Sequence, residues 1–374
     1  MLYLKTIKNC FMRVSLNYLI IFLVSTVFFG CGNTSEDKAY QKDQVKGVWS
    51  KERANEWYQQ WGWLAGANFN PSSAINQLET WQAATFDEEA IDRELGWAES
   101  IGMNAMRVYL HHVAWQQDPE GFKQRMDRYL TIANSHGIGT LFVFFDDCWN
   151  ERYTAGPQPE PKVGVHNSGW VEDPGILIHE KPEIIDSLEI YFKDVMSAFA
   201  NDKRIVLWDL YNEPGNSGYG NKSLPLLKKA FQWGREVNPV QPLSAGVWKF
   251  ELKDLNTYQL ENSDVITYHN YRPLEQHEAV IDTLKKLGRP IICTEYMART
   301  MNSTFQDIMP LLKENNIGAI NWGLVSGKSN TIYAWNTPIP SGEEPDVWFH
   351  DIFRKDGTAY SEEEIAVIKE LTSK

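Results

Sequence analysis

The chain of 374 residues is poor in cysteine, and its four cysteines do not have the spacing of a zinc site. They are Cys10, Cys31, Cys148 and Cys293, with no CxxC pair among them. Because Cys148 and Cys293 lie far apart in the sequence, we expect them to be buried free thiols. The sequence also has no HExxH motif and no nucleotide or flavin signature. We therefore predict neither a metal nor another cofactor.

Positive charge is also in short supply, with 36 lysine and arginine residues against 49 acidic residues and a net charge of −13. An acidic chain is a poor candidate for binding nucleic acid or anionic lipid through charge, so no nucleic-acid partner is predicted. Aromatic residues, in contrast, are abundant, with 15 tryptophans and 16 tyrosines. They suit a large core, but flat indole faces also suit the apolar faces of pyranose rings. The composition alone leaves these two uses of the aromatic residues open. The protein is expected to be a monomer.

The first thirty residues differ from the rest, because they carry Lys5, Lys8 and Arg13, no acid, and an apolar run that ends in small residues. This composition predicts a secretory signal peptide over residues 1–30. The ending "VFFGC" resembles a bacterial lipobox, in which cleavage precedes a cysteine that takes up lipid, here Cys31. A single transmembrane anchor is the alternative, although the run is near the lower limit for spanning a bilayer.

The next segment is polar, "GNTSEDKAYQKDQVKG", and predicts a flexible tether. We therefore assign residues 31–48 to the lipidated cysteine and the tether, and residues 49–374 to one folded domain. On either interpretation the domain is exported and meets a bacterial membrane only through its anchor. The lipoprotein interpretation favours the outer membrane.

From Gly62 onward, strand-like segments alternate with segments of helical apolar spacing. Several of the helical segments end in Gly or Asn, as helices do. The weakest helical segment lies between the fifth and sixth strands. Eight strands are predicted, at residues 62–70, 103–111, 137–146, 204–212, 241–248, 264–271, 289–296 and 317–325.

Eight such repeats over about 310 residues predict a single closed (β/α)8 barrel of the α/β class. A doubly wound open sheet is the alternative. It would need a glycine-rich phosphate loop after an early strand, and "GANFNPSSA" is not one. Two long connections, residues 146–180 and 326–351, follow the third and eighth strands. They should lie at the carboxyl ends of the strands, where barrel active sites are found.

Polar and aromatic residues end most of the predicted strands, at the expected mouth of the barrel. Glu213 and Glu295 stand out, because the fourth and seventh strands face each other across the mouth. We expect their carboxyl groups to be about 5 Å apart, the spacing of retaining glycosidases, since inverting enzymes need more room. In chain order the strand-end residues are Arg107, His111, His112, Asp146, Asp147, Asn212, Glu213, Trp248, His269, Tyr271, Glu295 and Trp322.

These residues resemble the retaining (β/α)8 glycoside hydrolases of clan A, and most closely the cellulase and β-mannanase type of family 5. The resemblance rests on "NEP" after the fourth strand, "TEY" at the end of the seventh, Arg107, and the His-x-Tyr of "YHNY". It covers roughly residues 60–325. Members of this family often have a histidine at the end of the third strand, where this chain has Asp146-Asp147-Cys148-Trp149. The substrate class is therefore not carried over.

The resemblance implies that Glu295 is the nucleophile, which forms a glycosyl-enzyme intermediate, and that Glu213 is the acid/base. The charge of Glu295 is expected to raise the pKa of Glu213 until Glu295 is esterified. Arg107 is expected to favour the ionised form of Glu295, and Tyr271 to donate a hydrogen bond to Glu295. Asn212 is expected to bind the sugar 2-hydroxyl, and His269 to position Glu213 or the substrate.

The remaining candidates divide by position. Trp322 is expected to be the sugar platform at the cleavage subsite, and Asp209 is expected to bond inside the barrel wall without a chemical role. The further candidates for contact with sugar are Trp149, Trp170, Trp248 and Trp335, whereas the tryptophans assigned to the core are Trp97 and Trp233. Structural or surface roles are expected for His111, His112 and His166.

Three functions remain open from the sequence, and a carbohydrate is the expected partner in each. The first is a retaining β-glycoside hydrolase for mannan-, glucan- or xylan-type glycans, and the two long loops favour short or exo-processed substrates. The second is a lipoprotein that only binds glycans, although such a protein would not need both glutamates. The third is a transglycosidase that uses the same pair.

Overall fold

The computed structural model of the chain describes residues 47–373. The predicted signal peptide, the lipid site Cys31 and nearly all of the tether lie outside the described residues and stay predictions. Within residues 47–373, none of the helices is both long enough and apolar enough to cross a membrane.

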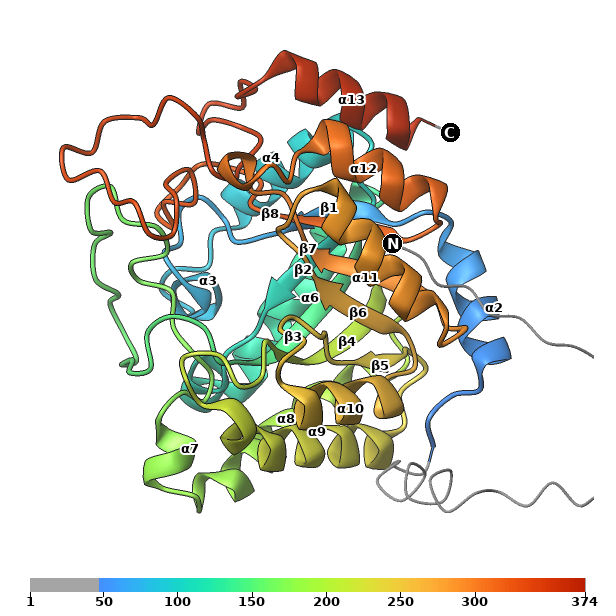
Figure 1. Ribbon diagram of the computed structural model, residues 1–374. Coiled ribbons are helices and arrows are strands. Elements are labelled where there is room, and N and C mark those ends of the chain that lie inside the picture. Colours follow the sequence, from blue (N-terminus) through green and yellow to red (C-terminus); the bar gives the residue numbers. More distant parts are fainter. Residues whose placement is uncertain (1–46, 374) are drawn as a thin grey trace, which may run out of the picture. The chain divides into compact units, whose positions relative to one another are not determined.

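Eight parallel strands form a nearly closed barrel, in the order β5-β4-β3-β2-β1-β8-β7-β6 (Figure 1). The two ends of this order meet at Val247, whose N–H donates to the Thr267 carbonyl at 3.0 Å and whose carbonyl accepts from the His269 N–H at 2.9 Å. The predicted (β/α)8 barrel is thereby confirmed over the doubly wound sheet. The strands are β1 Ala65–Asn68, β2 Ala105–Tyr109, β3 Gly139–Asp146, β4 Ile205–Asn212, β5 Leu243–Ser244, β6 Ile266–His269, β7 Ile291–Glu295 and β8 Gly318–Trp322.

Helices surround the strands, and their bounds agree with the apolar periodicity of the sequence. The marginal helical segment between β5 and β6 does form a helix, α10. The helices are α2 Lys51–Trp61, α3 Gln77–Trp81, α4 Glu88–Ser100, α5 His112–Gln117, α6 Pro119–Ser135, α7 Leu177–Glu180, α8 Ile184–Ala198, α9 Leu224–Val237, α10 Lys253–Asn262, α11 Leu274–Lys285, α12 Phe305–Glu314 and α13 Glu362–Thr372.

Five of the helices were not predicted: α2, α3, α5, α7 and α13. Helix α2 begins at an N-cap, where the Ser50 hydroxyl accepts from the Arg53 N–H at 3.2 Å. Its Tyr58 is buried with side chains from the starts of several strands, among them Leu64 and Leu141. Helix α2 therefore covers the amino-terminal end of the barrel and leaves the other end for the site.

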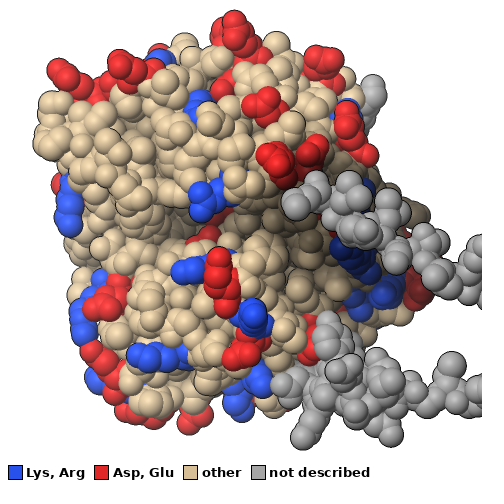
Figure 2. Space-filling view, in the orientation of Figure 1, with Lys and Arg blue, Asp and Glu red and all other residues tan. Residues whose placement is uncertain are grey.

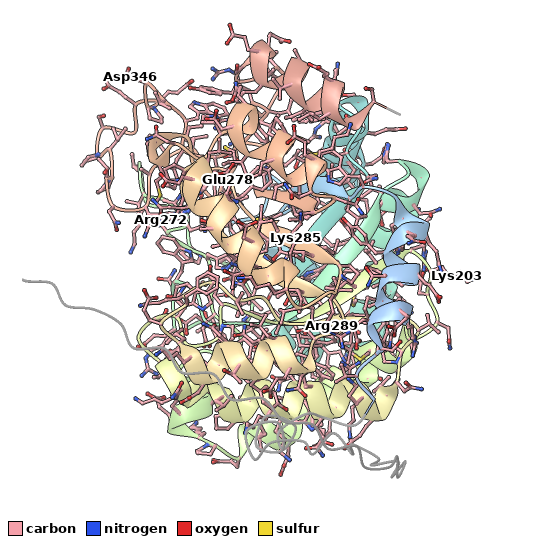
Figure 3. All side chains as sticks on the ribbon, turned by 45° about the vertical axis from the view of Figure 1, so that its right-hand side comes forward. Lys203, Arg272, Glu278, Lys285, Arg289 and Asp346 are labelled. Carbon is pink, nitrogen blue, oxygen red and sulfur yellow. The ribbon has the colours of Figure 1, made fainter. Side chains whose placement is uncertain are left out.

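The two ends of the barrel can be followed in Figure 3. Arg272, just after β6, and Asp346, in the loop after β8, lie on one side of the molecule. Lys203, just before β4, lies on the other. The side with Arg272 and Asp346 is the mouth, and both long loops emerge there, as predicted.

The core accounts for part of the aromatic content. Trp233 is buried, and Trp97 packs against the core, as predicted for both. Cys148 and Cys293 are buried free thiols, which also confirms the prediction.

Candidate active site

The site is built around Glu213 and Glu295, which the barrel brings to opposite sides of its mouth. Strand β4 ends at Asn212, and Glu213 follows with a left-handed backbone (φ 43°). The turn is held because the Gly215 N–H donates to Asp147 Oδ2 at 2.7 Å and to Ser223 Oγ at 3.0 Å. Strand β7 ends at Glu295 itself. The local turn chemistry of Pro214 and Gly215 thus places the Glu213 side chain at the mouth.

The two carboxylates are close together and largely shielded from water. One oxygen of each glutamate and one ring nitrogen of His269 all lie within 4.8 Å of one another. The exposed fraction of the side chain is 12% for Glu213 and 6% for Glu295. This spacing agrees with the separation of about 5 Å that the barrel geometry predicted.

Glu295 accepts hydrogen bonds from three side chains. Arg107 Nη1 and the Tyr109 hydroxyl both donate to Oε1 at 2.8 Å, and the Tyr271 hydroxyl donates to Oε2 at 2.7 Å. Burial raises the pKa of both tyrosines well above the ordinary value, so both hydroxyls keep their protons. Three side-chain donors, one of them positively charged, therefore hold the Glu295 carboxylate in place.

Arg107 is fully buried and links several groups of the site. Its Nε donates to Asp209 Oδ2 at 2.9 Å, and its Nη1 donates to Asn68 Oδ1 at 2.8 Å. Burial alone would lower the pKa of Arg107, but Tyr109, Asp209 and Glu295 beside it raise the pKa well above its usual value. Asp209 therefore bonds inside the barrel, as predicted, and its partner is the cation beside Glu295.

Glu213 has a different set of neighbours. Its Oε1 lies 2.8 Å from His269 Nδ1, and its Oε2 accepts from Asn216 Nδ2 at 2.6 Å and from the Cys148 thiol at 3.3 Å. Burial raises the pKa of Glu213, but the hydrogen bond and charge of His269 outweigh it and leave the pKa lowered. The predicted increase from Glu295 is therefore wrong for this state, because His269 contacts Glu213 directly.

Asn212 is held in place on both sides of its amide. Its Oδ1 accepts from Arg107 Nη2 at 2.7 Å and lies 3.1 Å from the Tyr109 hydroxyl, while its Nδ2 donates to Asp146 Oδ1 at 2.8 Å. The other oxygen of Asp146 accepts from Trp170 Nε1 at 2.7 Å. Asp146 ends β3, where the enzymes that this sequence resembles often have a histidine. In this chain Asp146 orients Asn212 and Trp170.

The mouth opens into a cleft of about 930 Å³ that contains both glutamates, His269 and Tyr271. The surface is hollowed at mid-height in Figure 2, where most atoms belong to uncharged residues. Every tryptophan proposed for sugar contact reaches this cleft: Trp149, Trp170, Trp248, Trp322 and Trp335. Trp149 is the most open, with 42% of its surface exposed, and Trp170 is buried.

The two long loops contact each other at one end of the cleft. The Asn167 N–H donates to the Ser329 carbonyl at 2.8 Å, and the Ile339 N–H donates to the Gly164 carbonyl at 3.0 Å. The Nδ1 of His166 also lies 2.8 Å from the Tyr333 carbonyl. The loops after β3 and β8 thus form one continuous wall, on the side of the mouth where Trp322 lies.

His111 and His112 have structural roles, as predicted, and lie away from the two glutamates. The His112 N–H donates to Asp173 Oδ2 at 2.8 Å, and its ring pairs with the other oxygen of Asp173. The Nε2 of His111 lies 3.2 Å from the Glu172 carbonyl, and burial lowers the pKa of His111 to about 4. Both rings are therefore used to fix the 172–173 segment. His166, in contrast, lines the cleft.

Tyr109 and Asn216 are among the site residues that were missed in the sequence. Tyr109 follows Arg107 by two positions on β2, so the alternation of a strand places both on the same face. Tyr109 could therefore have been found from the sequence. Asn216 lies in the turn after β4, where its side-chain direction depends on backbone angles that no sequence pattern specifies.

The sequence model described as Cellulase (glycosyl hydrolase family 5) matches residues 91–328. A comparison with curated proteins found no match. Among solved structures, an endo-beta-1,4-mannanase from Thermotoga petrophila is similar, with a TM-score of 0.55 and 14% identity over 84% of this chain and 77% of that chain. A GH5_18 protein from Streptomyces cattleya in complex with Manb1-4GlcNAc has a TM-score of 0.57 and 12% identity, over 83% and 80% of the two chains.

A third similar structure is an exo-beta-1,4-mannosidase from Opitutaceae bacterium strain TAV5. Its TM-score is 0.57 and its identity 16%, over 83% of this chain and 59% of that chain. At these identities the three likenesses concern the fold.

Proposed function

The chain belongs to glycosyl hydrolase family 5 and is a glycoside hydrolase, and on this premise we propose that it is a retaining enzyme that removes sugars from the non-reducing end of short β-linked glycans. The observation that carries the proposal is the pair of carboxylates, Glu213 and Glu295, with oxygens within 4.8 Å of one another. That spacing suits direct attack by one carboxylate and leaves little room for a water between an inverting pair.

In the first step a Glu295 oxygen forms a bond to the anomeric carbon while the bond from that carbon to the leaving oxygen breaks. Glu213 gives its proton to the leaving oxygen, so no free alkoxide is released. Asn212 lines the cleft and is fixed from both sides, which suits a contact to the 2-hydroxyl that strengthens in the transition state.

In the second step Glu213 takes a proton from water, whose oxygen forms the new bond to the anomeric carbon. The bond to Glu295 breaks and its carboxylate returns. A sugar hydroxyl in place of water would give transglycosylation with the same residues.

His269 and Glu213 together account for the proton that the first step needs. The 2.8 Å contact between His269 Nδ1 and Glu213 Oε1 lets one proton sit on either atom. His269 lowers the pKa of Glu213 while no sugar is bound, so the first step needs a proton on Glu213 that this contact can pass to it.

Exo action is supported by the wall that the two long loops form. Hydrogen bonds such as Asn167 N–H to the Ser329 carbonyl, 2.8 Å, join the loops at one end of the cleft. The other end is lined by exposed residues after β5 and β6, among them Phe250, with 45% of its surface exposed, and Arg272. A substrate can therefore extend from the open end, but not through the wall.

The test is hydrolysis of aryl β-glycosides and of manno-, gluco- and xylo-oligosaccharides, with mannosides first because the similar structures include mannanases and a mannosidase. We expect single sugars to appear from the non-reducing end, and mid-chain fragments alone would contradict exo action. A 2-fluoro glycoside should label Glu295 covalently.

Variants of the pair sharpen the test. Glu295→Gln should lose the label and reduce kcat by a factor of about 10⁴ or more, whereas Glu213→Ala should accumulate the intermediate on activated substrates. Glu363→Gln, an exposed acid on α13, is the control and should match the wild type. An absence of both hydrolysis and label across the panel would contradict the proposal and favour the alternative, a protein that only binds glycans.

We also propose that the domain is exported and anchored through lipid on Cys31. The support is the basic and apolar composition of residues 1–30 and the "VFFGC" ending. Metabolic labelling with a fatty acid should mark the full chain and not the Cys31→Ser variant. Equal labelling of both would contradict the lipid site.

A further inference from the structure

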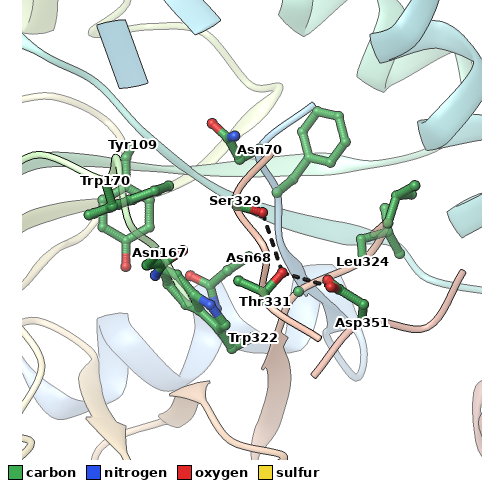
Figure 4. Close-up of a pocket in the computed structure, with 13 residues that line it drawn as sticks. Asn68, Asn70, Tyr109, Asn167, Trp170, Trp322, Leu324, Ser329, Thr331 and Asp351 are labelled. Carbon is green, nitrogen blue, oxygen red and sulfur yellow. Dashed lines mark hydrogen bonds between the residues drawn. The ribbon is translucent and has the colours of Figure 1, made fainter. Parts of the chain in front are cut away.

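A small side pocket adjoins the cleft and shares three residues with it: Asn167, Trp170 and Trp322. Its volume is about 20 Å³, which is room for about one water-sized group. Figure 4 shows Asn167 beside Trp322 and Trp170 at one wall, with Asp351 at the opposite wall. A single hydroxyl could enter this pocket from a sugar lying in the cleft.

Asn167 is the polar residue at the entrance, and its amide is unused. Its surface is 1% exposed, yet neither Oδ1 nor Nδ2 has a hydrogen-bond partner within the described part of the protein. Its backbone is left-handed (φ 45°), and its N–H donates to the Ser329 carbonyl at 2.8 Å. Buried amides are nearly always paired, so an amide fixed by its backbone and left unpaired points to a ligand.

The position of Asn167 relative to the reacting groups decides which part of a ligand it meets. The proton donor Glu213 sits on the side of the leaving group, toward Trp248, and the nucleophile Glu295 marks the anomeric carbon. In a pyranose ring, carbons 3 and 4 lie farthest from the leaving group. They would face the loop wall that carries Asn167, across the Trp322 platform.

The far wall of the pocket offers a second polar contact. One oxygen of Asp351 accepts from the Thr331 hydroxyl at 2.7 Å, while its Oδ1 has no partner among the described residues. Burial raises the pKa of Asp351 to about 7, so near neutral pH this group can donate as well as accept. A hydroxyl in the pocket would therefore meet polar atoms on both sides.

We propose that Asn167 binds the 3- and 4-hydroxyls of the sugar in the cleavage subsite, and that the enzyme requires this sugar to be an unsubstituted non-reducing end. This inference rests on the proposed function and deepens it. The amide offers one acceptor and one donor in the same plane, which matches two neighbouring hydroxyls. A further sugar on the 4-hydroxyl would have to occupy a pocket with room for one water-sized group.

The experiment compares an aryl β-glycoside that the wild type hydrolyses with its 4-deoxy analogue. A site built to bond a hydroxyl rejects the analogue that lacks it, because the buried amide is left unpaired. We expect the wild type to prefer the parent substrate in kcat/KM by about 10- to 100-fold.

Asn167→Gly is the informative variant, because glycine adopts φ 45° without strain. Asn330→Gly is its matched control, since Asn330 is also left-handed (φ 58°) and lies in the same loop wall, where its Nδ2 donates to the Lys162 carbonyl at 3.0 Å. In Asn167→Gly the ratio of kcat/KM for the parent substrate to kcat/KM for the 4-deoxy analogue should fall toward one, because kcat/KM for the parent substrate falls. In Asn330→Gly this ratio should remain unchanged.

An unchanged preference in Asn167→Gly, or an equal loss in Asn330→Gly, would overturn the inference. Thermal unfolding of both variants keeps folding defects apart from binding defects. Labelling of Glu295 by a 2-fluoro glycoside is read in parallel. A wild type that is labelled but does not distinguish the 4-deoxy substrate refutes this inference and leaves the proposed function standing, whereas an unlabelled and inactive wild type refutes both.

Discussion

The Nε of Arg107 lies 2.9 Å from Asp209 Oδ2, and the Nη1 of the same guanidinium lies 2.8 Å from Glu295 Oε1. One buried cation therefore joins an acid of the barrel interior to the proposed nucleophile. Asp209 touches no reacting atom in this arrangement. It positions Arg107, and through Arg107 it positions Glu295.

Removing the charge of Asp209 should therefore harm both stability and catalysis. In Asp209→Asn the guanidinium stays buried with one of its two carboxylate partners lost, and the free energy of unfolding should fall by about 3 kcal/mol. With Arg107 less well held, kcat should fall more than KM changes. Urea unfolding and steady-state kinetics measure the two effects.

The control for Asp209→Asn is Glu88→Gln, which breaks an exposed pair with Arg128 (2.6 Å, side chains about half exposed). Such pairs contribute at most about 1 kcal/mol. Equal loss of stability in the two variants, or unchanged kcat in Asp209→Asn, would contradict the positioning role.

The Cys148 thiol is the second group whose effect can be measured through its neighbour. It donates to Glu213 Oε2 at 3.3 Å, and burial raises the pKa of Cys148 so that the thiol keeps its proton. A donor to a carboxylate stabilises the ionised form and lowers its pKa. In Cys148→Ala the pKa of Glu213 should rise, and the alkaline limb of the kcat/KM profile should move up by roughly half a pH unit to one unit.

Cys148→Ser separates this effect from packing. The serine hydroxyl can donate to the same oxygen, so the alkaline limb should stay near its wild-type position. If alanine and serine shift the limb equally, the effect is structural and the hydrogen bond to Glu213 does not set the profile.

Much of the site could be predicted because a barrel converts chain order into position. Once eight strands are recognised, the ends of β4 and β7 must face each other, and Glu213 and Glu295 follow. Arg107 and Tyr271 could be placed near the mouth by the same argument, although the structure has Arg107 in the middle of β2 and Tyr271 two residues after the end of β6. The structure places both within 2.8 Å of Glu295.

Features that depend on contacts between distant segments could not be predicted. The lowered pKa of Glu213 comes from the orientation of the His269 ring, and the unpaired amide of Asn167 comes from two loops that meet through about 160 intervening residues. Tyr58 shows the same limit, because it is one of only two buried residues of helix α2, and the side chains that bury it come from distant strands.

The buried carboxyl of Asp351 gives a prediction about stability and pH. Its pKa is raised to about 7 by burial, against about 3.9 for an unfolded aspartate. The folded state therefore holds this proton more tightly between pH 4 and pH 7. The resulting stabilisation is present below pH 4 and is lost as the pH rises through 7, with a slope of about 1.4 kcal/mol per pH unit at most.

Asp351→Asn should remove this dependence, because asparagine is neutral, has the same shape and tolerates the left-handed backbone (φ 54°). Near pH 4 the variant and the wild type should differ little, and the variant should become progressively more stable than the wild type up to about pH 7. Urea unfolding at several pH values measures the difference, with Asp356→Asn, an exposed aspartate of the segment before α13, as control.

Since Asp147 also has a pKa raised to about 7, the wild-type curve alone cannot identify Asp351, but the difference between the two curves can. A difference that stays constant between pH 4 and pH 7 would show that Asp351 does not hold its proton in the folded protein.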